Sequence, residues 1–161
     1  MSRPTVGTIG ALIVVAFILT TIAVFTKGWI VFTVSYFGVK ASEGVGIVPY
    51  RSNEVTWFAA ASWLMFISFG LFFPLFVVYL HAGYKVHRHG CCHSIRHSFH
   101  GISLLASLIT IMQAVAFILV AVNCTHYSAY ASEQLGFSAY LALVSAIFTT
   151  IAMSLSGFLL F

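Results

Sequence analysis

Residues 101–122 read GISLLASLITIMQAVAFILVAV, a stretch with no charged side chain and a single amide, Gln113, near its middle. A helix needs about 20 apolar residues to cross the hydrocarbon core of a bilayer, and this stretch supplies them. Three further apolar stretches of similar length occur, at residues 6–26, 55–80 and 137–161. The sequence therefore predicts four transmembrane helices.

The composition of the whole chain is also that of a membrane protein. Of its 161 residues, 61% are hydrophobic and 6% are charged, whereas soluble domains carry roughly 25% charged residues. So few charged side chains cannot cover a soluble core of this size, and lipid has to supply the apolar surroundings. We therefore expect an all-α membrane protein, with residues 1–161 forming a single four-helix bundle.

The basic residues predict the orientation of the bundle. Arg3 precedes the first stretch, and three more basic residues lie in the loop of residues 81–100. Positive charge favours the cytoplasmic side of a membrane, so we expect this loop and both termini in the cytoplasm. The loops at 27–54 and 123–136 together carry three basic and three acidic residues. We expect these two loops outside the cell, with the plasma membrane or a cell junction as the location.

The spans contain features expected to govern how the helices pack. Small residues recur along the last stretch at alternating spacings of four and three, which lets helix backbones approach closely. Gln113 is expected to form a hydrogen bond between helices, and Pro74 to bend the second helix by clashing with the Gly70 carbonyl. The expected packing residues are Gly70, Pro74, Gln113, Ser138, Ala142, Ser145, Thr149, Ala152 and Ser156.

The first outer loop has the pattern of β-structure. Residues 29–37 are rich in β-branched and aromatic side chains, and a Gly-rich turn separates them from residues 45–50, which predicts a small β-ribbon. A two-stranded ribbon is marginal by itself, so it should rest on the helix ends or on another chain. Candidate partner contacts, with anchoring at the membrane interface as the alternative, are Trp29, Phe32, Tyr36, Phe37, Tyr127 and Tyr130.

Three features of the loops suggest ligand binding or modification. Six histidines cluster in or beside residues 81–100, but a zinc site needs a fixed tetrahedral ligand set that nothing in this loop suggests, so we expect no metal. Cys91 and Cys92 lie beside the membrane, where palmitoylation and unmodified thiols are equally compatible with the sequence. Asn123 begins a glycosylation pattern, yet its place at the end of the third stretch argues against modification.

The sequence offers no catalytic machinery. No Asp, Glu, Lys, Arg or His lies near the middle of a span, which argues against a pump or an ion-coupled transporter. Neither a phosphate-binding glycine loop, a Ser-His-Asp set nor a zinc-protease motif occurs. We therefore expect no enzyme activity, no catalytic residue, no cofactor and no nucleic-acid partner.

Two segments resemble a known family. Residues 133–141, Glu-Gln-Leu-Gly-Phe-Ser-Ala-Tyr-Leu, lead through small residues to Ser156-Gly-Phe-Leu-Leu160 and resemble a claudin fourth span, and Lys27-Gly-Trp29 resembles the family's Trp after the first span. With its four spans and larger first outer loop, the chain is similar over nearly its whole length to the claudin and peripheral myelin protein superfamily. It departs from the family in lacking the Gly-Leu-Trp signature and the following cysteine pair of that loop.

The resemblance implies a non-enzymatic protein that acts through protein contacts in the membrane. The sequence favours an auxiliary subunit of a larger channel or receptor, because the bundle has small-residue faces and no transport machinery, and its outer ribbon could rest on a partner's ectodomain. The missing cysteine pair, which leaves the ribbon without a covalent staple, weighs against a junctional role. The alternative is adhesion or barrier formation at cell junctions, with claudin-like proteins in the same or the facing membrane as partners. Membrane lipid is expected as a partner in either role.

Overall fold

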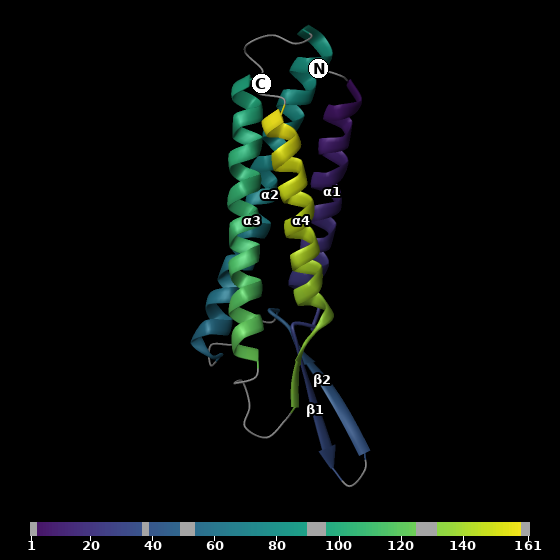
Figure 1. The fold of residues 1–161 in the computed structure, drawn as a ribbon, viewed down its shortest axis with the longest axis vertical. Helices are drawn as coiled ribbons and strands as arrows, with labels where there is room; N and C mark the ends of the chain where they lie inside the picture. The colour runs from purple at the N-terminus through teal and green to yellow at the C-terminus, as the bar shows by residue number, and fades with distance from the viewer. Residues whose placement is uncertain (1–2, 37–38, 49–53, 90–95, 125–131, 159–161) are drawn as a thin grey trace.

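The structure is a computed structural model that describes residues 3–36, 39–48, 54–89, 96–124 and 132–158. Within these residues, four helices form an elongated bundle and a three-stranded sheet extends from one end of it (Figure 1). The elements in chain order are α1 (Arg3–Phe25), β1 (Ile30–Tyr36), β2 (Val39–Val45), α2 (Thr56–His89), α3 (Arg96–Asn123), β3 (Ser132–Leu135) and α4 (Phe137–Phe158).

All four helices are long and apolar enough to cross a membrane. Large hydrophobic side chains remain on the outside of the bundle, with Val77, Leu104 and Val122 each about two-thirds exposed. An apolar exterior of this kind requires lipid in place of water. The expected fold class, a four-helix membrane bundle with a small β-structure attached, is confirmed.

The second and third helices extend beyond the expected spans. α2 has 34 residues, or about 50 Å at 1.5 Å per residue, which exceeds the hydrocarbon thickness of about 30 Å. Residues 81–89 and 96–100, expected in a loop, are helical. The sequence of residues 81–89 contains no proline, so nothing stops α2 where its apolar run ends.

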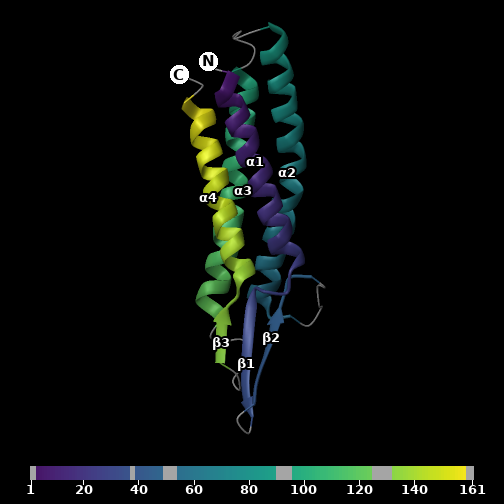
Figure 2. The ribbon, with the colours of Figure 1, turned by 90° about the vertical axis from the view of Figure 1, so that its right-hand side faces the viewer.

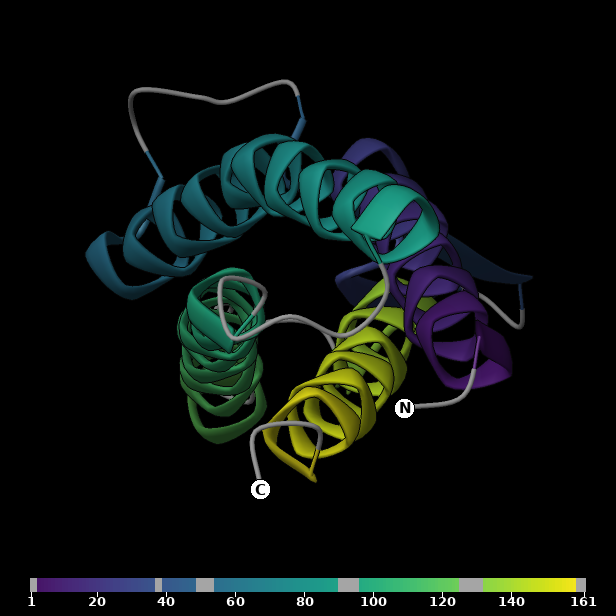
Figure 3. The same ribbon diagram turned by 90° about the horizontal axis from the view of Figure 1, so that it is seen from above.

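The helices pack in the spatial order α1, α4, α3, α2, with a smaller contact between α1 and α2 (Figure 3). Two hydrophobic clusters fill the interior. One includes Ile13, Phe72 and Ile109, and the other, which includes Trp29 and Met65, adjoins the sheet. The sheet is thus built onto one of the two cores of the bundle.

The small-residue stripe of α4 is buried between its neighbours. Ser145 Oγ donates to the Ala16 carbonyl of α1 at 2.8 Å, and Thr149 Oγ1 lies 2.8 Å from Thr110 Oγ1 of α3. The stripe therefore joins α4 to both adjacent helices. Its buried members are Ser138, Ala142, Ser145, Thr149, Ala152 and Ser156.

Gln113 links three helices at the middle of the bundle. Its side chain is fully buried, and Nε2 donates to Thr20 Oγ1 of α1 at 2.7 Å. The same hydroxyl lies 2.7 Å from Ser145 Oγ of α4. This chain of polar contacts sets the positions of α1, α3 and α4 relative to one another.

Gly70 and Pro74 have a different environment from the one expected. Both are exposed on α2, and no atom lies within 4 Å of the point where a Cβ on Gly70 would sit. They therefore do not pack helix against helix within this chain. α2 continues through Pro74 and is bowed when seen down the bundle (Figure 3).

Candidate functional site

The candidate site is the sheet, which projects past the end of the bundle opposite to the start of α1 and the end of α4 (Figures 1 and 2). β1 is its central strand and pairs antiparallel with both β2 and β3. Ile30 pairs with Val45 and Leu135, and Phe32 pairs with Glu43 and Glu133. The predicted ribbon thus gains a third strand from the second outer loop.

The second strand of the ribbon lies earlier than expected. The Gly-rich segment before residue 45 is not a turn but most of β2, whereas Gly46 follows the strand. The glycines serve a close backbone crossing instead. A Cβ on Gly46 would lie 2.7 Å from the Thr26 carbonyl oxygen, and one on Gly44 would collide with the Lys27 carbonyl.

Trp29 fixes the sheet to the first helix. Its side chain is fully buried, and its indole N–H donates to the Ala23 carbonyl of α1 at 2.6 Å. Its backbone N–H donates to the Val45 carbonyl at 2.9 Å. Trp29 is therefore unavailable to a partner in this structure, and its place in the list of contact candidates is corrected to a role inside the molecule.

The fourth helix holds the sheet from the other side. Gly136 N–H donates to the Trp29 carbonyl and Ser138 N–H to the Gly28 carbonyl, both at 2.9 Å. A Cβ on Gly136 would collide with the Gly28 carbonyl. We call Gly28, Trp29, Gly44, Gly46 and Gly136 the joint between bundle and sheet. The glycines of the joint lie beside strand ends, and the sequence alone does not show which backbone segment passes close to each of them.

The other contact candidates are only partly described by the structure. Phe32 is half-buried and packs on the cluster around Trp29. Tyr36 ends β1 opposite Val39, and its side chain lies outside the described part. The three remaining candidates, Phe37, Tyr127 and Tyr130, lie outside the described residues.

The sheet leaves strand edges open. In the described part of the chain, the order β2-β1-β3 gives β2 a partner on one side only. Among the described residues, β3 covers β1 no further than Thr33, and residues 34–36 pair with β2. Ser42 and Glu43 on β2 are exposed. An open edge of this kind accepts another strand through its unpaired amide and carbonyl groups.

The modification sites fall around the helix ends. Asn123, at the end of α3, is half-buried and donates its side-chain amide to the Leu119 carbonyl at 2.8 Å, an arrangement unfavourable for glycosylation. Cys91 and Cys92 lie outside the described residues, between α2 and α3. Among described side chains, no group of three His, Cys, Asp or Glu residues is placed to hold a metal ion.

Comparison with known proteins finds one family model that matches nearly the whole chain. Residues 1–160 match the family model described as "Tight junction protein, Claudin-like". A search of curated proteins finds no significant match. The family match spans the four helices and all three strands, so it covers both the bundle and the candidate site.

Proposed function

Because the chain belongs to the claudin-like tight junction protein family, we propose that it is a contact protein of cell junctions that joins other copies of itself through the free edge of β2. The observation that carries this mechanism is the seven-residue strand β2, whose outer edge has no neighbour among the described residues, on a sheet that projects beyond the bundle. Main-chain pairing along such an edge supplies affinity, and the flanking side chains supply specificity.

The proposal places the sheet outside the cell and both termini in the cytoplasm. The basis is charge, because the basic residues that no acidic residue balances lie at the start of α1, near the end of α2 and at the start of α3, which are at the end of the bundle opposite the sheet (Figure 1). They are Arg3, Lys85, Arg88 and Arg96. A test is a Ser42→Cys variant in a Cys91→Ser, Cys92→Ser background, labelled with a membrane-impermeant maleimide. Labelling in intact cells supports the orientation, and labelling only after permeabilisation contradicts it.

The bundle offers less support for a lateral partner than its sequence suggested. The small-residue stripe that could have met another helix is buried between α1 and α3. Its hydroxyls already have acceptors inside the molecule, so the stripe is not available as an outer packing face. This burial moves our preference from an auxiliary subunit to a junctional protein.

The functional test mixes two populations of cells that express differently tagged copies and otherwise lack junction proteins of this family. We expect the protein to concentrate where two expressing cells meet and not where an expressing cell meets a non-expressing one. Charge reversal at Lys40→Glu or Glu43→Lys should reduce this enrichment. Lys85→Glu is the control, because Lys85 lies near the end of α2, away from the sheet. Enrichment insensitive to the β2 variants would contradict the mechanism.

A second candidate function remains supported by one observation. The first outer loop contains no cysteine, so no disulfide can staple β1 to β2 as in the family pattern. A sheet without that staple fits an accessory subunit that rests on the ectodomain of a larger channel or receptor. Purification in mild detergent tests this role, because a larger protein recovered in fixed stoichiometry would favour it over self-association.

A further inference from the structure

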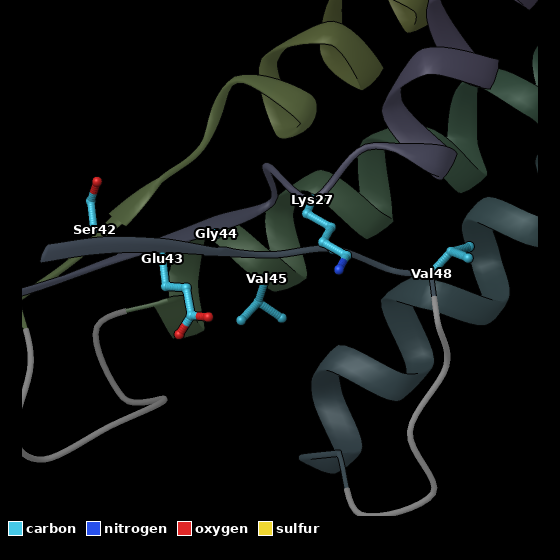
Figure 4. Close-up of a pocket in the computed structure, with 7 residues that line it drawn as sticks. Lys27, Ser42, Glu43, Gly44, Val45 and Val48 are labelled. Atoms are coloured by element: carbon cyan, nitrogen blue, oxygen red, sulfur yellow. The ribbon is translucent and has the colours of Figure 1, made fainter.

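A pocket of about 350 Å³ lies where the end of β2 meets the bundle (Figure 4). Lys27 and Glu43 supply its charged groups, and Val45 and Val48 supply apolar surface. Ser42 and the backbone at Gly44 and Gly46 complete the lining. The close crossing at these two glycines thus also shapes this pocket.

The pocket carries two opposite charges that do not neutralise each other. Lys27 and Glu43 are both exposed, and their side chains point to the same side of β2, whereas Ser42 points to the opposite side (Figure 4). Within the described part of the chain, no ion pair is found at either side chain. A free anion would be repelled by Glu43 and a free cation by Lys27, so the pocket favours a group that carries both charges.

The order of the two charges follows the direction out of the membrane. Lys27 lies two residues after the end of α1 at Phe25 and directly follows the apolar stretch of residues 6–26, so it lies close to the edge of the hydrocarbon. Glu43 pairs with Phe32, two positions further out along β1 than the pairing of Val45 with Ile30. Two strand residues correspond to about 7 Å. The positive charge is therefore close to the membrane and the negative charge further out.

We propose that this pocket binds the zwitterionic headgroup of a phospholipid in the adjacent leaflet. In such a lipid the phosphate adjoins the glycerol, close to the hydrocarbon, and the ammonium group lies further out. Lys27 would bind the phosphate and Glu43 the ammonium, while Val45 and Val48 pack on the carbon atoms between them. This inference goes beyond the junctional role and does not depend on it, because it concerns the base of the sheet and not the outer edge of β2.

The test uses the purified full chain, stripped of lipid in detergent and supplied with phosphatidylcholine or phosphatidylglycerol of identical acyl chains. Native mass spectrometry then measures how much of each lipid the protein retains. The wild type should retain phosphatidylcholine preferentially, and each of Lys27→Gln and Glu43→Gln should lower that preference about two- to fivefold, as expected for exposed charge pairs. Lys85→Gln, at the other end of the bundle, should change nothing.

Conservative variants separate headgroup binding from damage to the fold. Lys27→Arg and Glu43→Asp keep the charges and should keep the preference, whereas the double reversal Lys27→Glu with Glu43→Lys should lose it.

Soluble glycerophosphocholine identifies the source of the ligand. Displacement of the lipid shows that the headgroup alone suffices, and retention of the lipid shows that a membrane-anchored headgroup is required. Equal retention of the two lipids by the wild type, or a preference unchanged in both Gln variants, overturns the proposal.

Discussion

The middle of the bundle and the joint at its end are held together in different ways. At the middle, short hydroxyl-bearing side chains such as Thr20, Ser145 and Thr149 make several contacts that partly duplicate one another. At the joint, one buried indole and a few glycine crossings hold the sheet against two helices. The bundle therefore has redundancy that the joint lacks.

This difference shows where function resides in the molecule. The hydroxyl groups of the small-residue stripe find partners within the chain, so the bundle is largely self-contained, although Gln113 Oε1 is buried without a hydrogen-bond partner among the described residues. The sheet is fixed at its base, yet its outer edge is open within the described residues. A rigid base with an open edge is suited to strand addition, since the edge is presented without first having to be ordered.

The largest expected effect is at Trp29. Replacing a buried large aromatic by alanine costs about 3–5 kcal/mol in protein cores, and Trp29→Ala also leaves the Ala23 carbonyl of α1 without its indole donor. We expect loss of the folded protein or a large fall in its unfolding temperature in detergent. Trp63→Ala is the matched control, because Trp63 is 56% exposed. A control as unstable as Trp29→Ala would show that burial at the joint is not decisive.

An intermediate effect is expected at Gly136. Adding a Cβ there forces apart two backbone segments at Gly28, and overpacking of this kind costs about 1–3 kcal/mol. Gly136→Ala should lower the unfolding temperature and increase proteolysis of the sheet. Gly7→Ala has nothing within 4 Å of its Cβ and should be neutral or slightly stabilising, as expected for alanine inside a helix. If the two variants had the same unfolding temperature and the same rate of proteolysis, the close backbone contact at Gly136 would not stabilise the sheet.

The smallest effect is expected inside the bundle. Thr20→Val removes the hydroxyl shared by Gln113 and Ser145, and hydrogen bonds between membrane helices are worth about 0.6 kcal/mol on average. Unfolding in mixed detergents should show a small but measurable loss. Thr21→Val is the control, because the Thr21 hydroxyl bonds to Phe17 within its own helix. If Thr20→Val lost more stability than Trp29→Ala, the bundle and not the joint would be the part more sensitive to a single substitution.

Much of the fold follows directly from the sequence. Length and hydropathy are sufficient to identify membrane helices, because backbone groups in lipid must pair within the segment. The ends of the helices are predicted less accurately, since α2 continues past residue 80 into polar sequence. The spacing of small residues in α4 indicated its buried face, because that spacing repeats every helical turn.

The site was harder to predict from the sequence. β3 has only four residues, Ser132–Leu135, too few to show alternation. The sequence predicts a turn at Gly44 and a strand at Gly46, because a sequence does not show which backbone passes beside a glycine. Trp29 follows the end of α1, where a buried indole and an interface anchor have the same sequence signature. These features depend on contacts between distant segments, and local pattern carries no information about them.

A cysteine scan along residues 40–43 in a Cys91→Ser, Cys92→Ser background tests whether two copies of the chain meet through the edge of β2. Facing residues of paired antiparallel strands lie about 4.5–5.5 Å apart at Cα, which is within the range for a disulfide. In cells in contact, self-association through β2 predicts intermolecular cross-linking that peaks at one position of the scan and exceeds that of Thr56→Cys, an exposed site at the same end of the bundle. Cross-linking along the scan no stronger than at Thr56→Cys would contradict contact through the β2 edge.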